Sequence, residues 1–306
     1  MKKGLSCVLL GVTMLFGSMH PFIYEIVVLK RINPVSRKTQ HFIGLSDFHD
    51  KKNVANAIQL ICIKDFLQSQ NKDRTKIILE DLSTDSNNGK HGVCRQFQIN
   101  SRGGILGGLA HSCRQNGLLV DNIEYRYCRV AALGPLLNNE HQKIHDFPSA
   151  CGVKVCDIAH EIHNAIADIA AYTSCCAALG AYREKILKRV EPTMNTLYLL
   201  KDSKHSMADY VQKHSQETNR FELLKQLLIF DSPLLDLKLA RSILTADQCD
   251  TIIAIAGGSH ITRVKEMLRS AGYQIVYSTP SKVTKDPKPI DLSPLKHSLR
   301  QLMAQR

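Results

Sequence analysis

Four short apolar segments, each followed at once by ionisable residues, constrain the fold of this chain more than any other feature. They are rich in β-branched residues, as buried strands are, and they read HFIGLSDFHD (41–50), KIILED (76–81), LLVDNIEYR (118–126) and TIIAIAGGSH (251–260). Segments with the apolar spacing of helices lie between them. Because alternating strands and helices form a parallel sheet covered by helices, the sequence predicts an α/β fold with a mainly parallel sheet and flanking helices.

The order of the segments also predicts how the 306-residue chain is divided. Alternation of strands and helices marks a first part of the α/β core at 25–135 and a second part at 246–280. Between them, 136–245 shows helical spacing almost throughout, which predicts an inserted helical region that covers the core. The Pro- and Lys-rich end, 281–306, is interpreted as a basic tail.

The N-terminal segment, 1–24, is interpreted as a signal peptide or an N-terminal anchor. Lys2 and Lys3 precede an uncharged apolar stretch of the length found in signal peptides. No small-x-small cleavage site follows, and the apolar run is short for a spanning helix, so both alternatives stay open. The expected location is exported, either periplasmic or secreted, or anchored by this segment.

Composition and motifs argue against nucleic-acid binding and against a structural zinc site. The net charge of +12 suits an anionic partner, but Lys and Arg are spread along the chain and no nucleic-acid-binding motif occurs, so nucleic acid is not the expected partner. Membrane contact is expected only through an uncleaved N-terminal segment. The ten cysteines form no CxxC motif, which argues against a structural zinc site and leaves any disulfide pairing open.

The residues that follow the strands predict one shared site. In a parallel sheet the carboxyl ends of the strands border the binding crevice, so residues far apart in sequence meet there. The candidate catalytic residues at these ends are His49, Glu80, Arg126 and His260. We expect them to handle a small-molecule or peptide substrate.

Two chemical routes are open at such a site. In the first, a divalent metal ion is bound by Asp47, His49, Glu80 and His260, and it lowers the pKa of a bound water that acts as nucleophile. In the second, no metal takes part. His49 or His260 is the general base, a carboxylate orients it, and Arg126 stabilises developing negative charge.

Taken together, these motifs resemble the TraB/Tiki, ChaN and erythromycin-esterase group. The resemblance rests on GLSDFHDKKN, on a strand ending in Glu80, and on AGGSH followed by a helix and AGYQIVY. In that group two GxxH-type elements and an acidic strand end frame one cleft. Residues 257–260 match the second element, whereas Ser46 stands where the first element has Gly. The resemblance covers 38–130 and 250–278.

The resemblance implies hydrolysis of a peptide or ester bond. Tiki proteins use a metal-dependent route, and the esterases use a His–carboxylate route. The alternative is a non-catalytic binding or structural protein on the same scaffold.

A second histidine cluster, DIAHEIHNAIAD at 157–168, is the main alternative to the site at the strand ends. His160 and His163 are three positions apart, so the zinc-peptidase HExxH motif is absent. One alternative has His160 and His163 as ligands on one helix face, with Asp157 or Asn164 nearby. The favoured interpretation is an ordinary amphipathic helix, whose polar residues lie around a solvated face and whose buried stripe is Ile158, Ile162, Ile166 and Ile169.

Overall fold

The chain is described by a computed structural model. It describes residues 23–33, 35–47, 57–81, 105–138, 143–170, 177–199, 201–215 and 231–279. Two of the predicted segments, the basic tail and all but the last two residues of 1–24, lie outside these ranges.

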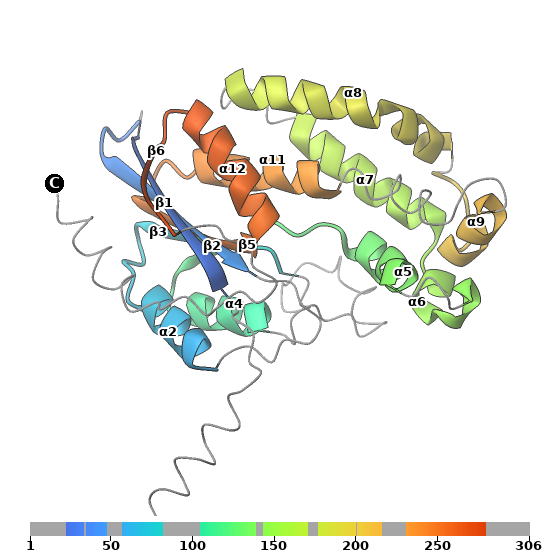
Figure 1. Cartoon of the computed structure of the whole chain (residues 1–306), viewed down its shortest axis with the longest axis horizontal. Coiled ribbons are helices and arrows are strands. Elements are labelled where there is room, and N and C mark those ends of the chain that lie inside the picture. Colours follow the sequence, from blue (N-terminus) through green and yellow to red (C-terminus); the bar gives the residue numbers. More distant parts are fainter. Residues whose placement is uncertain are drawn as a thin grey trace, which may run out of the picture.

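Within the described ranges, six strands form one mixed sheet, which helices cover on both faces (Figure 1). Its order is β4-β3-β5-β2-β1-β6. The strands are β1 (Ile23–Ile32), β2 (Thr39–Asp47), β3 (Thr75–Leu79), β4 (Leu119–Asn122), β5 (Thr251–Gly257) and β6 (Gln274–Ser278). The roughly α/β class predicted from the sequence is therefore confirmed.

The prediction of a mainly parallel sheet is only partly confirmed. β4, β3, β5 and β2 pair in parallel, so the predicted strand at 251–257 does share a sheet with the strand at 39–47. β1 pairs antiparallel with both β2 and β6. The reason lies in chain length: only residues 33–38 separate β1 from β2, and a parallel crossover needs a dozen residues or more.

The helices fall into three groups in space (Figure 1). α2 (Ala57–Gln68) and α4 (Ile105–Gln115) cover one face of the sheet, and α11 (Asp231–Leu244) and α12 (Gly258–Ser270) cover the other. The remaining elements extend away from the sheet, namely α5 (Tyr127–Asn138), η2 (Ile144–Asp146), α6 (Pro148–Gly152), α7 (Val155–Ala170), α8 (Ala177–Leu199) and α9 (Met207–His214).

Successive side chains of the central strand β5 point to opposite faces of the sheet, so they join two different parts of the hydrophobic core. Ile252 and Ala254 of β5 join the cluster with α11 and α12, whereas Ile253 and Ile255 join the cluster with α2 and α4. Every residue of β5 is buried, as expected for a central strand covered on both faces. β5 therefore carries the polar residues that follow it into the middle of the protein.

Local sequence signals set several element ends. α4 and α12 are followed by Gly117 (φ 76°) and Gly272 (φ 89°), whose left-handed backbone ends a helix without steric cost. In α2, Phe66 and Leu67 are buried against the sheet, whereas Ile61 is 60% exposed.

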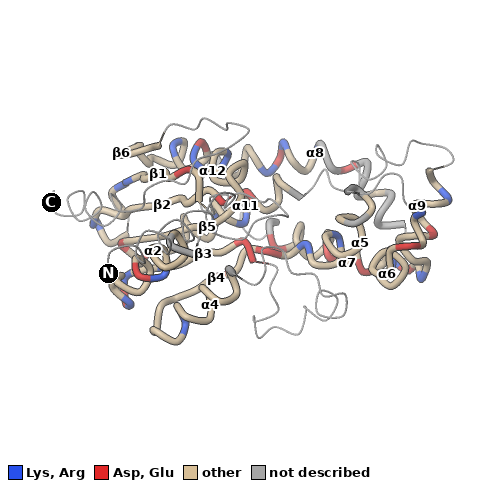
Figure 2. The backbone as a smooth tube through the Cα atoms, turned by 60° about the horizontal axis from the view of Figure 1, so that its bottom comes forward, with Lys and Arg blue, Asp and Glu red and all other residues tan. Residues whose placement is uncertain are grey.

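Basic and acidic residues are distributed differently over the described part of the chain. Lys and Arg are spread over most elements, whereas acidic residues gather beyond the ends of β3 and β4 (Figure 2). No helix within the described ranges has the length and apolarity needed to cross a membrane. The predicted limits of the N-terminal segment, the helical insertion and the tail stay predictions, and so does export. The predicted N-terminal segment, 1–24, overlaps β1, which begins at Ile23.

Candidate functional site

Glu80 is the hub of the polar residues at the carboxyl edge of the sheet. It follows β3, which lies directly beside β5. One carboxylate oxygen accepts a hydrogen bond from the backbone N–H of Gly257 (2.7 Å), and the other accepts one from the Arg126 guanidinium (2.6 Å). Glu80 is only 2% exposed, so both hydrogen bonds are made away from bulk water. The strand-end carboxylate thus connects β5 to the loop after β4.

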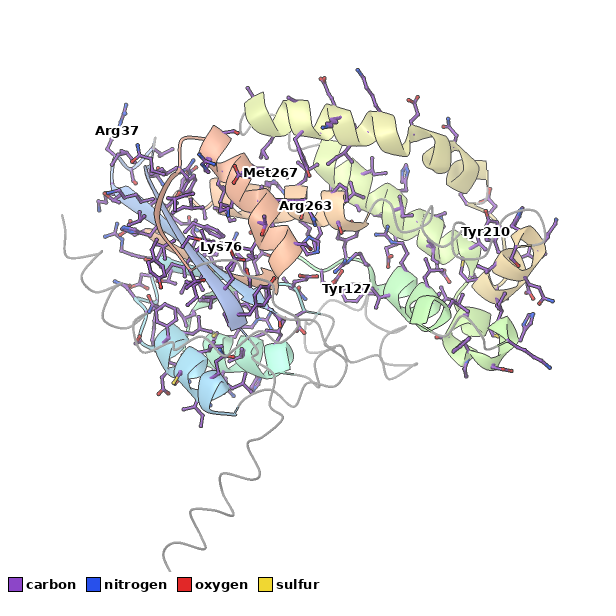
Figure 3. The ribbon with its side chains drawn as sticks, in the orientation of Figure 1. Arg37, Lys76, Tyr127, Tyr210, Arg263 and Met267 are labelled. Carbon is purple, nitrogen blue, oxygen red and sulfur yellow. The ribbon has the colours of Figure 1, made fainter. Side chains whose placement is uncertain are left out.

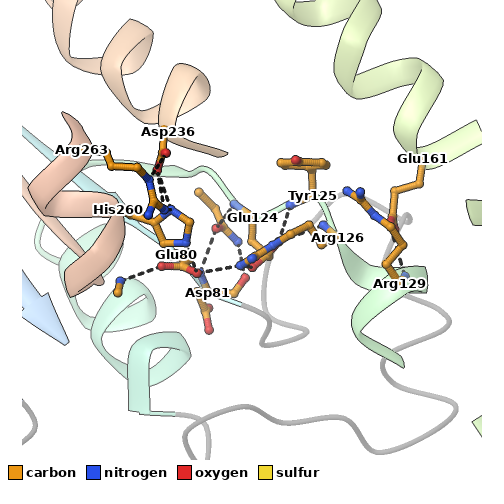
Figure 4. Close-up of polar contacts among 12 residues, drawn as sticks. Glu80, Asp81, Glu124, Tyr125, Arg126, Arg129, Glu161, Asp236, His260 and Arg263 are labelled. Carbon is orange, nitrogen blue, oxygen red and sulfur yellow. Dashed lines mark hydrogen bonds and ion pairs between the residues drawn. The ribbon is translucent and has the colours of Figure 1, made fainter. Parts of the chain in front are cut away.

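Arg126 is held between two carboxylates. Besides Glu80, its guanidinium donates to both oxygens of Glu124, at 2.8 and 2.6 Å. Glu124 also accepts the backbone N–H groups of Tyr125 and Arg126 (Figure 4). This many charge-assisted hydrogen bonds fix the guanidinium in one orientation.

The charge on Glu124 is stabilised by this arrangement. Burial by itself raises the pKa of the Glu124 carboxyl. The Arg126 guanidinium and its hydrogen bonds outweigh burial and hold this pKa below its usual range, although the charge of Glu80 acts in the opposite direction. Glu124 is therefore ionised at neutral pH.

His260 lies in the first turn of α12, directly after β5, and its two ring nitrogens face different carboxylates. Nδ1 lies 2.6 Å from Oδ1 of Asp236, which comes from α11. Nε2 lies 3.7 Å from Glu80, beyond hydrogen-bonding distance. Arg263 lies one turn along α12 (Figure 3), and its guanidinium also contacts Asp236 (Figure 4). The imidazole is thereby held between α11 and the end of β3.

The Asp236 contact determines the tautomer of His260. A carboxylate oxygen has no proton to donate, so a contact of 2.6 Å requires the proton on Nδ1. Arg263 Nη2 lies 3.3 Å from the same nitrogen, a longer contact that does not compete with it. In the neutral ring the lone pair is then on Nε2, on the side of Glu80.

The structure brings together three of the predicted catalytic residues. Glu80, Arg126 and His260 belong to one connected group of side chains (Figure 4). Asp47, the last residue of β2, is buried and pairs in register with Gly257, so it lies at the same edge. His49 lies outside the described residues.

Ser46, next to the last residue of β2, has a local partner. Its hydroxyl donates to Glu25 of β1 at 3.0 Å, and both residues are buried. Ser46 is therefore part of the contact between β1 and β2.

Glu80, one of the described residues of the predicted metal site, already has hydrogen-bond partners. Both oxygens of Glu80 already accept hydrogen bonds, one of them from a guanidinium whose positive charge opposes a cation. No three His, Cys, Asp or Glu side chains within the described ranges are arranged to hold a metal ion. The predicted set includes His49, so a metal site there stays a prediction.

The rival histidine cluster is the amphipathic helix α7. Ile158 and Ile162 are buried, whereas His160 and His163 are exposed. Glu161 between them accepts from the backbone N–H of Cys128 (2.6 Å) and from the fully buried Arg129 (3.0 Å). The hydrogen bonds of Glu161 thus link α7 to the start of α5.

Sequence reasoning missed Asp236 and Arg263. Asp236 lies in a segment interpreted only as a helix, yet it shares its buried side with Ala240 and Ile243, at spacings of four and seven residues. A carboxylate in the apolar stripe of a helix needs a partner, and that signal was present in the sequence. It could not identify the partner as His260, because the packing of α11 on α12 is a tertiary feature.

Comparison of the chain with protein-family models, with curated proteins and with solved structures finds no significant match.

Proposed function

We propose that the chain is an exported hydrolase of ester or peptide bonds that uses His260 as its general base. The observation that carries this proposal is the asymmetry of the His260 ring, with Nδ1 against Asp236 at 2.6 Å and Nε2 toward Glu80 at 3.7 Å. A histidine oriented by a carboxylate through one nitrogen has the other nitrogen available for proton transfer.

Water is the nucleophile in this proposal. In this mechanism a water molecule donates one O–H group to the lone pair on Nε2 and the other to the nearby Oε1 of Glu80, which also accepts from Arg126. As the water oxygen bonds to the substrate carbonyl carbon, its proton passes to Nε2 and the carbonyl π electrons move to oxygen. The imidazolium, stabilised by Asp236, then returns the proton to the leaving group as the bond to that group breaks.

Arg126 has the role of stabilising negative charge at the carbonyl oxygen. Its fixed orientation between Glu80 and Glu124 means that little reorganisation is needed during the reaction. The resemblance to the TraB/Tiki, ChaN and erythromycin-esterase group supports the same reaction class. Within that group, the hydrogen bonds of Glu80 favour the metal-free route.

The second candidate is a non-catalytic binding or structural protein. It is favoured by the charge balance around Arg126, whose guanidinium is shared by two buried carboxylates, as in many structural ion-pair networks. The two candidates differ in what a His260 substitution changes: activity in the first, only stability in the second.

The test uses purified full-length protein with p-nitrophenyl acetate as an ester and an aminoacyl p-nitroanilide as an amide. We expect hydrolysis of at least one, and a loss of about 10²-fold or more in kcat for His260→Gln and Asp236→Asn. His163→Gln is the matched control, since this exposed histidine is remote from the network, and it retains full activity.

Three outcomes separate the hypotheses. Wild-type protein that hydrolyses neither probe, or His260→Gln protein that remains fully active, contradicts the proposal and favours the second candidate. Activity abolished by a chelator and restored by a divalent ion assigns the reaction to the metal route predicted from the sequence.

A further inference from the structure

A second histidine–thiol arrangement lies on the helices that extend away from the sheet. The exposed thiol of Cys151, in α6, lies 3.9 Å from Nδ1 of His145 in η2 and 3.6 Å from the His145 carbonyl oxygen. The other ring nitrogen of His145, Nε2, contacts the side-chain oxygen of Gln212 in α9. None of these residues belongs to the network around His260.

We infer that Cys151 is a reactive thiol, activated by His145 and oriented by Gln212, that undergoes exchange with small disulfides. The carbonyl oxygen of Gln212 can only accept, so the contact places the ring proton on Nε2. Nδ1 then carries the lone pair on the side of the Cys151 sulfur. This is the chemical logic of a thiol nucleophile with an adjacent base that a third group orients.

The surrounding backbone holds the three residues in place. The N–H of Cys151 bonds to the Phe147 carbonyl at 3.1 Å, and Ala150 beside it is fully buried. Gln212 follows the fully buried Val211 of α9.

The segments before α7 and α9 are joined by two backbone hydrogen bonds. The N–H of Val155 donates to the His205 carbonyl (3.0 Å), and the N–H of Met207 donates to the Val153 carbonyl (2.9 Å). The imidazole and the amide therefore face each other across a fixed junction.

The other thiols give a natural comparison. Of the six cysteines within the described ranges, Cys151 is the exposed one. Burial raises the pKa of the Cys113 thiol to about 11 and also raises the pKa of Cys249, which leaves both protonated and unreactive. Cys156 lies 4.0 Å from the Asp157 carboxylate, whose charge opposes a thiolate.

The exchange reaction balances without any further reagent. Nδ1 of His145 takes the S–H proton, and the sulfur of Cys151 bonds to one sulfur of the disulfide as the S–S bond breaks. The departing thiolate receives the proton from the imidazolium. Cys151 ends as a mixed disulfide, and one equivalent of the small thiol is released.

The experiment measures the alkylation rate of each cysteine in the folded full-length protein, with limiting iodoacetamide and site-resolved mass spectrometry. We expect Cys151 to react first, His145→Gln to slow it about tenfold and Gln212→Leu to slow it about threefold. His205→Gln removes another exposed histidine near α9 and leaves the rate unchanged. With oxidised glutathione, the mixed disulfide forms at Cys151 before any other described cysteine.

Circular dichroism confirms that each variant is folded. Equal rates at Cys151 in the wild type, His145→Gln and Gln212→Leu proteins would show that exposure alone sets the reactivity, and would overturn the inference. Preferential glutathionylation of Cys156 or Cys62 would also contradict it.

Discussion

At the scale of single residues, the site is a set of charges removed from water. Glu80, Glu124 and Asp236 are all buried: Glu80 and Glu124 share the Arg126 guanidinium, and Asp236 pairs with that of Arg263. A buried charge is costly unless paired and hydrogen-bonded, so these residues depend on one another. Sequence reasoning located Glu80, Arg126 and His260 because each lies within a few residues of the end of a recognisable strand. It missed Asp236 because a helix in a covering layer has no comparable marker.

The Glu124–Arg126 pair predicts a specific acid sensitivity. The folded-state pKa of Glu124 is lowered, so its contribution to the free energy of unfolding is fully present above the unfolded pKa of about 4.3. That contribution is lost as pH falls through the folded pKa, because the unfolded state binds a proton first. We expect Glu124→Gln to lower the free energy of unfolding by about 3 kcal/mol at pH 7 and to flatten its fall below about pH 4.3.

Glu266→Gln is the matched control for this prediction. Glu266 pairs with Arg269 at 2.9 Å, but 58% of its side chain is exposed, so its loss changes stability by less than about 0.5 kcal/mol. Urea unfolding at pH 7 and below pH 4.3 measures both variants. If Glu124→Gln costs no more than the control, the pair does not stabilise the fold as described.

At the scale of elements, the junction of β5 and α12 positions the histidine. The strand is buried throughout, and the helix begins at Gly258 without a loop, which leaves His260 in its first turn. A run of apolar residues ended by Gly-Gly made this junction readable from the sequence. The antiparallel placement of β1 was less readable, because its apolar content fits any buried strand and only the short connection to β2 decides its direction.

Gly258 is required by the space around this junction. A β-carbon at this position would stand 1.5 Å from the hydroxyl oxygen of Tyr24 on β1. We expect Gly258→Ala to lower the free energy of unfolding by about 1–3 kcal/mol, because Tyr24 or α12 must shift. Gly108→Ala in α4 is the same change where nothing lies within 4 Å, and it stabilises the helix by about 0.5–1 kcal/mol. Thermal unfolding of both variants checks this, and equal effects of the same sign would refute the packing argument.

At the scale of the whole molecule, the site exists because four distant segments meet at one edge. Residues 80, 126, 236 and 260 come from the end of β3, the loop after β4, the covering helix α11 and the start of α12. The sequence predicted the edge, since parallel strands bring their carboxyl ends together. It could not predict which helix closes the site, because that depends on how α11 packs against α12 over the sheet.

The tautomer of His260 tests the central claim most directly. Long-range 1H–15N NMR of the folded protein, with the ring assigned from the His260→Gln variant, shows which nitrogen carries the proton in the neutral ring. We predict protonated Nδ1 and unprotonated Nε2 in the wild type, and loss of this preference in Asp236→Asn. A neutral ring protonated on Nε2, or a ring indifferent to the Asp236 substitution, would contradict the assignment of His260 as a general base held by Asp236.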